Sequence, residues 1–101
     1  MSTEYIEPVD NKVTVLPPKK YAAVFHNDDI TPLAFVVKIL ENVFDKTPGE
    51  VNNIIAAVHK NGSCAAGVYT YDIAMTKKIQ TDKLSKINKY PLKITVREAE
   101  G

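Results

Sequence analysis

The chain has little of several residue types, and each shortage excludes a class of protein. Its 101 residues include one cysteine, four glycines and no tryptophan. The lone Cys64 cannot form an intramolecular disulfide, and no cysteine or histidine lies near it at the spacing of a zinc site. No run of 18 or more apolar residues occurs, so we predict no membrane-spanning segment and no membrane partner. We expect a soluble protein in a reducing, cytoplasmic setting.

An excess of charge is also missing. Thirteen basic and 12 acidic residues give a formal net charge of +1, which supplies no overall attraction to nucleic acid or to anionic membranes. The segment from Lys77 to Arg97 is an exception, with seven basic residues and the single acid Asp82. This segment could dock an acidic partner, or it could be solvated helix surface. Because no aromatic platform accompanies these lysines, we expect no nucleic-acid partner.

Length and composition indicate one folded domain, since domains cluster around 100–150 residues. With 45% apolar and 25% charged residues the chain matches an ordinary globular protein. Residues 1–17 are polar and unpatterned, and we expect a flexible N-terminal tail there, followed by a core domain over residues 18–101. The tail has acids and no apolar run, unlike a secretory signal or a transit peptide, so we expect the mature chain to begin near Met1.

Six elements are predicted after the tail. Apolar runs and alternation indicate strands, and a period of three to four residues indicates helices. The predicted elements are a strand at 21–25, a helix from 31–32 to about 44, a helix from 47 to about 61, a strand at 63–69, a helix from 71 to about 89, and a strand after 91. This β-α-α-β-α-β order predicts an α+β fold, with a small three-stranded antiparallel sheet covered by three helices on one face.

Local signals place the helix ends. Thr31 is expected to cap the first helix ahead of a proline. Residues 47–50 form a capping box, and Gly62 supplies the left-handed residue that ends the second helix. Thr70 is the expected cap of the third helix, whose apolar residues are too irregular to assign a packing face. The first two helices each carry a regular apolar stripe, namely Leu33, Val36, Val37, Leu40, Val43 and Phe44, and then Val51, Ile54, Ile55 and Val58.

Two groups of polar residues could carry chemistry. Asn27, Asp28 and Asp29 crowd a turn between a strand and a helix, where their acceptors suit a cation or where they serve as solvated turn residues. His59, at the border of an apolar stripe, could face a cleft or act as a C-terminal helix charge. Neither a nucleophile beside its base nor a set of converging metal ligands is evident, so we predict no metal and no cofactor.

Five motifs occur in a fixed order along the chain. They are Pro17-Pro18-x-x-Tyr21, His26-Asn27-Asp28-Asp29-x-Thr31-Pro32-x-x-Phe35-Val36, Val58-His59-x-x-Gly62, Gly67-Val68-Tyr69-Thr70 and Ala74-x-Thr76-Lys77. Together, from about residue 17 to residue 96, they resemble the ClpS family, the adaptors of the AAA+ Clp protease. The resemblance implies no enzymatic activity. It implies an adaptor that binds the free α-amine and the large hydrophobic N-terminal residue (Phe, Tyr, Trp or Leu) of N-degron substrates and delivers them to a Clp unfoldase.

By position, the resemblance also implies a binding site. Asn27, Asp29 and His59 are expected to bind the α-amine, with Asp28 beside them, because an ammonium has three donors and needs converging acceptors. The walls of the hydrophobic pocket are expected to be Thr31, Leu33, Val36, Ile55, Val58 and Leu92. Leu33 stands where the family commonly has methionine, so the preference among large apolar N-terminal residues depends on this position.

The implied partner is the N-terminal domain of a ClpA- or ClpC-like unfoldase. Asp72 and Lys77 on the third helix fit a charged contact with it, although Met75 stands where the family often has an acid. Three other interpretations stay open: a ClpS-like peptide-binding module that serves another partner, a small enzyme that uses an aspartate of the 27–29 turn with His59, and a protein that binds acidic partners through its basic C-terminal segment.

Overall fold

The computed structural model describes residues 17–99, and the predicted elements are all present in it. Their bounds are β2 (Tyr21–His26), α1 (Leu33–Asn42), α2 (Pro48–Asn61), β3 (Ser63–Tyr69), α3 (Tyr71–Asn88) and β4 (Lys93–Glu98). The predicted β-α-α-β-α-β order is therefore confirmed. Of the predicted tail over residues 1–17, all but the last residue lies outside the described residues.

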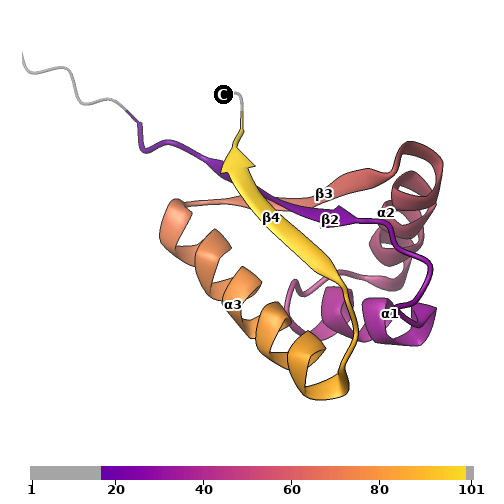
Figure 1. Cartoon of the computed structure of the whole chain (residues 1–101). Coiled ribbons are helices and arrows are strands. Elements are labelled where there is room, and N and C mark those ends of the chain that lie inside the picture. The colour runs from indigo at the N-terminus through magenta and orange to yellow at the C-terminus, as the bar shows by residue number, and fades with distance from the viewer. Residues whose placement is uncertain (1–16, 100–101) are drawn as a thin grey trace, which may run out of the picture.

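The sheet has β2 at its centre. The strand order is β3-β2-β4, and both outer strands run antiparallel to β2. The register places Phe25 opposite Cys64 of β3 and opposite Ile94 of β4, with one irregularity in the β3 pairing between Ala23 and Val24. In Figure 1 the three helices lie on one face of this sheet, which confirms the predicted fold class.

The core lies between the sheet and the helices. Phe25 of β2, Leu40 of α1 and Ile94 of β4 are fully buried. The Phe25 ring meets Phe44 edge to face, with ring centroids 5.1 Å apart. Since burying a side chain of this size contributes about 1.5–3 kcal/mol, these contacts hold the helices against the sheet. The buried cluster also includes Ala23, Ile39, Val51, Ile54, Val58, Ala66 and Leu92.

The ends of α2 are those that its sequence predicts. The Thr47 side chain accepts from the Glu50 N–H, and the Glu50 carboxylate accepts from the Thr47 N–H at 2.9 Å. At the other end Gly62 adopts a left-handed conformation with φ 88°, and its N–H donates to the Val58 carbonyl. Both ends are therefore set locally, and they fix where His59 stands in the last turn of the helix.

The start of α1 differs from the prediction. The helix begins at Leu33 with Pro32 as its N-cap, and no side chain caps it. The prediction that Thr31 caps this helix was wrong, because the N-cap position falls on Pro32, whose side chain has no acceptor, and the Thr31 hydroxyl donates to the Asp28 carboxylate. The residue before a proline is also held out of the helical conformation.

The packing face of α3 consists of small and polar residues. Ala74, Thr81 and Ser85 are buried, and Thr70 occupies the N-cap position without a side-chain capping bond. Apart from the half-buried Met75, the large apolar side chains of this helix are exposed, namely Tyr71, Ile73, Ile79, Leu84 and Ile87. Small residues let the helix approach the sheet closely, which explains why its apolar residues did not reveal a packing face.

Candidate functional site

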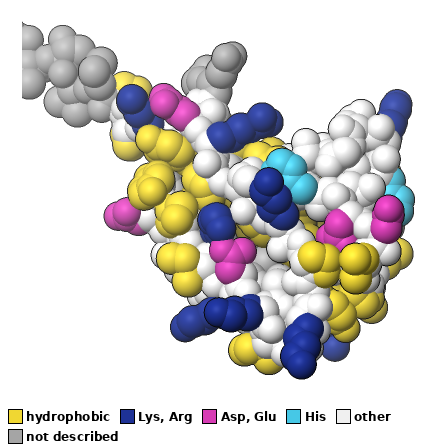
Figure 2. Space-filling view, viewed as in Figure 1, with side chains coloured by type: hydrophobic (Ala, Val, Ile, Leu, Met, Phe, Trp, Pro, Cys, Tyr) yellow, Lys and Arg dark blue, Asp and Glu magenta, His cyan; other side chains and the backbone are white. Residues whose placement is uncertain are grey.

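A cavity of about 350 Å³ opens where β2 ends, beside α1 and α2. In Figure 2 acidic and apolar side chains lie next to one another on the side of the molecule where α1 and α2 lie. The cavity is lined by every residue that the sequence predicted for the amine and for the pocket wall. The lining residues are Phe25, His26, Asn27, Asp28, Asp29, Thr31, Leu33, Val36, Ile54, Ile55, Val58, His59 and Leu92.

The inner wall of the cavity is apolar. Phe25, Ile54, Val58 and Leu92 are buried, whereas Leu33 is 55% exposed. Ligand pockets span roughly 300–1,000 Å³, so this one lies at the small end of that range. It suits one large apolar side chain with a short piece of the chain that carries it. Its exposure places Leu33 at the rim of the cavity. It is therefore not buried, unlike Leu40 on the predicted apolar stripe of the same helix.

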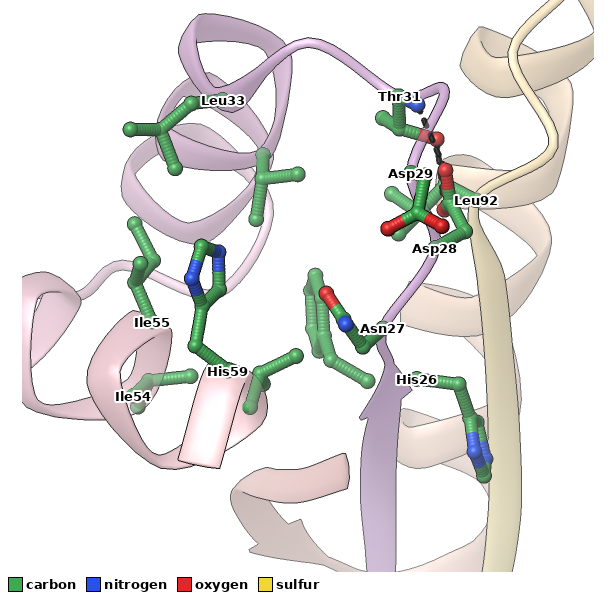
Figure 3. Close-up of a pocket in the computed structure, with 13 residues that line it drawn as sticks. His26, Asn27, Asp28, Asp29, Thr31, Leu33, Ile54, Ile55, His59 and Leu92 are labelled. Atoms are coloured by element: carbon green, nitrogen blue, oxygen red, sulfur yellow. Dashed lines mark hydrogen bonds between the residues drawn. The ribbon is translucent and has the colours of Figure 1, made fainter. Parts of the chain in front are cut away.

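The mouth of the cavity is polar. Asn27 and Asp29 follow β2, and His59 comes from α2; in Figure 3 the three side chains are turned toward the same space. The Asn27 backbone N–H donates to the Gly62 carbonyl at 2.9 Å, which fixes the start of the turn against the end of α2. Within residues 17–99 no group bonds to the side chains of Asn27, Asp29 or His59. Their acceptors are therefore free to receive the donors of a cation.

Asp28 has a different environment from its neighbour. Its Oδ1 accepts from the N–H groups of Ile30 and Thr31, at 2.8 and 2.6 Å, and its Oδ2 accepts from the Thr31 hydroxyl at 2.8 Å. Partial burial alone would raise the pKa of Asp28, but the hydrogen bonds from Thr31 and Ile30 outweigh it and lower the pKa below its usual value. The carboxylate is thus engaged within the turn.

Three lining residues do not belong to the predicted site, namely Phe25, His26 and Ile54. Phe25 and Ile54 form part of the inner wall, although Ile54 stands four residues before Val58 on the same stripe and could have been inferred from that spacing. His26 also borders the cavity, but its ring is turned away toward β4 (Figure 3), and its Nε2 lies 2.8 Å from the Thr95 hydroxyl. This contact is in line with a structural role for His26.

Asp72 and Lys77 lie on α3, apart from the cavity. Asp72 is exposed in the first turn of the helix. The Lys77 side chain is only 17% exposed, and its ammonium donates to the Val43 carbonyl at 2.7 Å. The same ammonium lies 5.7 and 5.4 Å from the ring centroids of Phe44 and Tyr69. Lys77 is therefore largely buried and anchored inside the fold, whereas Asp72 is exposed to solvent.

Residues 17–99 contain neither a candidate metal site nor a helix suited to cross a membrane. No set of three or more histidine, cysteine, aspartate or glutamate side chains in this part of the chain could hold a metal ion. Among the helices of these residues, none is both long and apolar enough to cross a membrane.

Comparison with known proteins gives one consistent result. Residues 16–95 match the family model described as ATP-dependent Clp protease adaptor protein ClpS. An ATP-dependent Clp protease adapter protein ClpS from Clostridium acetobutylicum is 46% identical over 98 residues, which cover 97% of both chains. The corresponding protein of Nautilia profundicola is 41% identical, with 89% of this chain and 93% of the relative covered.

A solved structure has the same fold. It is Agrobacterium tumefaciens ClpS2 bound to L-phenylalaninamide, which is 32% identical and has a TM-score of 0.77. The match covers 82% of this chain and 100% of that one. With a family model that spans most of the chain and a relative that matches nearly all of it, the assignment does not depend on any single motif. The chain belongs to the ClpS family, whose members are adaptor proteins of the ATP-dependent Clp protease and are not enzymes.

Proposed function

We propose that this adaptor binds the free α-amine and the large hydrophobic N-terminal residue of N-degron substrates, and that it delivers them to a cytoplasmic Clp AAA+ unfoldase. One observation supports the first step above all others. A single cavity joins an apolar interior to a mouth that presents three free acceptor side chains, Asn27, Asp29 and His59. An N-terminal residue combines the same two properties, an ammonium group and a side chain on one carbon atom.

The polar mouth would select the ammonium group. The Asn27 carbonyl, the Asp29 carboxylate and a neutral His59 nitrogen can each accept one of its three N–H bonds. Acetylation removes the charge and two of the donors, so a blocked terminus would leave acceptors unpaired. Charge-assisted hydrogen bonds contribute about 1.5–3 kcal/mol each.

The apolar interior would select the side chain. Burying one of the size of Leu or Phe contributes about 1.5–3 kcal/mol. Together with the amine contacts, and after the costs of ordering, this sum corresponds to micromolar affinity. Such an affinity suits an adaptor that must release its substrate. The ligand of the Agrobacterium relative, L-phenylalaninamide, has the same chemistry as an N-terminal phenylalanine residue, and it supports the same ligand class for this chain.

The proposal is tested by fluorescence anisotropy with five peptides. Four of them differ only in a first residue of Phe, Leu, Ile or Arg, and the fifth is the Phe peptide with an acetylated N-terminus. Free Phe and Leu are expected to bind, and Arg and acetylated Phe are expected to bind at least tenfold more weakly, or about 1.4 kcal/mol. The Ile peptide reports on the rim at Leu33. Equal binding of all five would overturn the proposal.

We further propose that the N-terminal end of α3 contacts the N-terminal domain of a ClpA- or ClpC-like unfoldase. Asp72 is exposed there next to two exposed apolar side chains, Tyr71 and Ile73. Lys77 follows one turn later, and we propose that it contributes chiefly by holding the helix in place, because its ammonium donates to the Val43 carbonyl.

A charge reversal tests this contact. Asp72→Lys is expected to weaken binding of the isolated unfoldase domain, measured by calorimetry, without changing affinity for the Phe peptide. Asp82→Lys, near the other end of the same helix, is the matched control and is expected to leave unfoldase binding intact. Equal losses in the two variants would point to overall charge and would argue against a local contact.

A further inference from the structure

We propose that Asp28 is a positioning residue, which fixes the turn that carries Asp29 and Thr31 and does not itself take the ammonium of the ligand. This inference rests on the proposed function, because it divides the roles of two adjacent aspartates in the same site. The resemblance places Asp28 beside the residues that bind the amine and gives it no role of its own.

The hydrogen bonds distinguish the two aspartates. Both oxygens of Asp28 already accept from three donors of the turn, with donor–acceptor distances of 2.6–2.8 Å. Asp29 receives no hydrogen bond from any group in the described part of the chain, and its carboxylate is turned to the cavity in Figure 3. An ammonium at Asp28 would have to compete with the donors that hold the turn together, whereas at Asp29 it meets free lone pairs.

The same hydrogen bonds act on the apolar side of the site. Thr31 lines the cavity, and its hydroxyl points to Asp28 in Figure 3, where the two are joined by a hydrogen bond. This bond satisfies the only polar group of the Thr31 side chain and leaves its methyl group for an apolar ligand. Asp28 therefore orients one residue for the amine and another for the side chain.

The ionisation of Asp28 agrees with this role. The hydrogen bonds from Thr31 and Ile30 outweigh the effect of burial and lower the pKa of Asp28, so the turn itself stabilises the charged carboxylate. Its charge is balanced by N–H and O–H dipoles within the turn, and no ligand is needed to satisfy it.

Two substitutions of Asp28 separate position from charge. Asp28→Asn removes the charge but keeps the turn, because the amide oxygen can accept from both N–H groups and the Thr31 hydroxyl can accept from the amide. Asp28→Ala removes the turn contacts as well. In anisotropy with the free Phe peptide we expect a loss of about threefold at most for Asp28→Asn, and of about tenfold or more for Asp28→Ala. Asp29→Asn, which removes a charge that faces the ligand, is expected to lose about tenfold or more.

Substitutions at Thr31 test whether Asp28 acts through this residue. Thr31→Val keeps the shape but loses the hydroxyl, and Thr31→Ser keeps the hydroxyl. We expect Thr31→Val combined with Asp28→Ala to bind little worse than Asp28→Ala alone, because both changes remove the same contact. Thr31→Ser is expected to retain the dependence on Asp28. Thermal unfolding of each variant distinguishes a local loss of affinity from a failure to fold.

The possible outcomes separate this inference from the function on which it rests. If the unmodified protein does not prefer free Phe over acetylated Phe, the proposed function fails and the inference fails with it. If it does, but Asp28→Asn loses as much affinity as Asp28→Ala and Asp29→Asn, only the inference fails, because the charge of Asp28 then acts on the ligand directly. Multiplicative losses in the Asp28→Ala, Thr31→Val pair would also overturn it.

Discussion

The second and third helices contact the rest of the protein in opposite ways. α2 buries branched apolar side chains, Val51, Ile54 and Val58, in the core and along the cavity. α3 is the longer helix, with 18 residues against 14, yet it buries only Ala74, Thr81 and Ser85. Most of the large apolar side chains of α3 are exposed, and Ile87 is 74% exposed.

The two helices therefore contribute differently to the stability of the fold and to the surface that a partner can bind. The contacts of α2 remove large apolar areas from water, so they contribute strongly to folding and also give the cavity its walls. The contacts of α3 remove less area per residue and leave apolar and charged side chains at the surface. We infer that α2 serves the ligand site and that α3 is the helix free to meet a partner.

The largest expected effect comes from truncating one apolar residue on each helix. Ile54→Ala on α2 is expected to lower the free energy of unfolding by about 2–5 kcal/mol, because it leaves a void in the core. Ile87→Ala on α3 is expected to change it by about 0.5 kcal/mol at most, as for an exposed site. Urea denaturation measures both values. A similar cost at the two positions would remove the contrast between the helices.

The next largest expected loss of stability comes from truncating one of two adjacent lysines on α3. Lys77→Ala is expected to lower the free energy of unfolding by about 1.5–3 kcal/mol, the usual contribution of a hydrogen bond to a charged group. The reason is that the Lys77 ammonium joins α3 to the Val43 carbonyl by a hydrogen bond. Lys78→Ala breaks only a pair with Asp82 on the same helix and is expected to cost about 0.3–0.5 kcal/mol. Equal losses in thermal unfolding would show that Lys77 is an ordinary surface lysine.

At a buried hydroxyl on α3, a substitution is expected to increase the stability of the protein. The Ser85 side-chain oxygen is buried and has no hydrogen-bond partner within residues 17–99. Ser85→Ala is therefore expected to raise the free energy of unfolding by up to about 1 kcal/mol, helped by the higher helix propensity of alanine. Thr81→Val is the control, because its hydroxyl donates to the Lys77 carbonyl, and no gain is expected there. A loss of stability in Ser85→Ala would refute the prediction.

The smallest expected effect is a change in how stability depends on pH, and it arises from Asp28 in the turn between β2 and α1. The pKa of Asp28 is lower in the folded protein than its usual value, so folding favours the ionised form. Its contribution to stability is complete above the usual pKa of aspartate, about 3.9, and is lost as pH falls through the lower folded value. Between about pH 5 and about pH 2, Asp28→Asn is expected to lose less stability than the unmodified protein. If the free energy of unfolding of the two proteins falls equally with pH, the turn does not stabilise the ionised form of Asp28.

The sequence predicted most of the fold because its local signals agree with the tertiary structure. The capping box at residues 47–50 and Gly62 give both ends of α2, and alternation gives β4. Thr31 misled the prediction of the α1 start, because the helix begins one residue later than its sequence indicates and the N-cap position falls on Pro32. The face of α3 was not predictable, because burial there follows close approach to the sheet and does not follow hydrophobicity.

The candidate site was predicted as a set of residues but not as a division of roles. The four residues of the motif from Asn27 to Pro32 that were predicted for the site, Asn27, Asp28, Asp29 and Thr31, all line one cavity. The motif gave no role to Asp28, which has the same chemistry as Asp29 and is adjacent to it in sequence. Only the directions of their carboxylates tell them apart, and these depend on the backbone of the turn. For the same reason Lys77 resembled a surface charge until its contact with Val43 was known.

The central position of β2 has a consequence for the timing of synthesis. β2 pairs with β4, so residues 21–26 cannot complete their hydrogen bonds until residues 93–98 have been synthesised. Leu92, just before β4, forms part of the cavity wall. A nascent chain that ends before these residues lacks one edge of the sheet and one wall of the cavity. The cavity is therefore incomplete until the chain has been synthesised through residue 98.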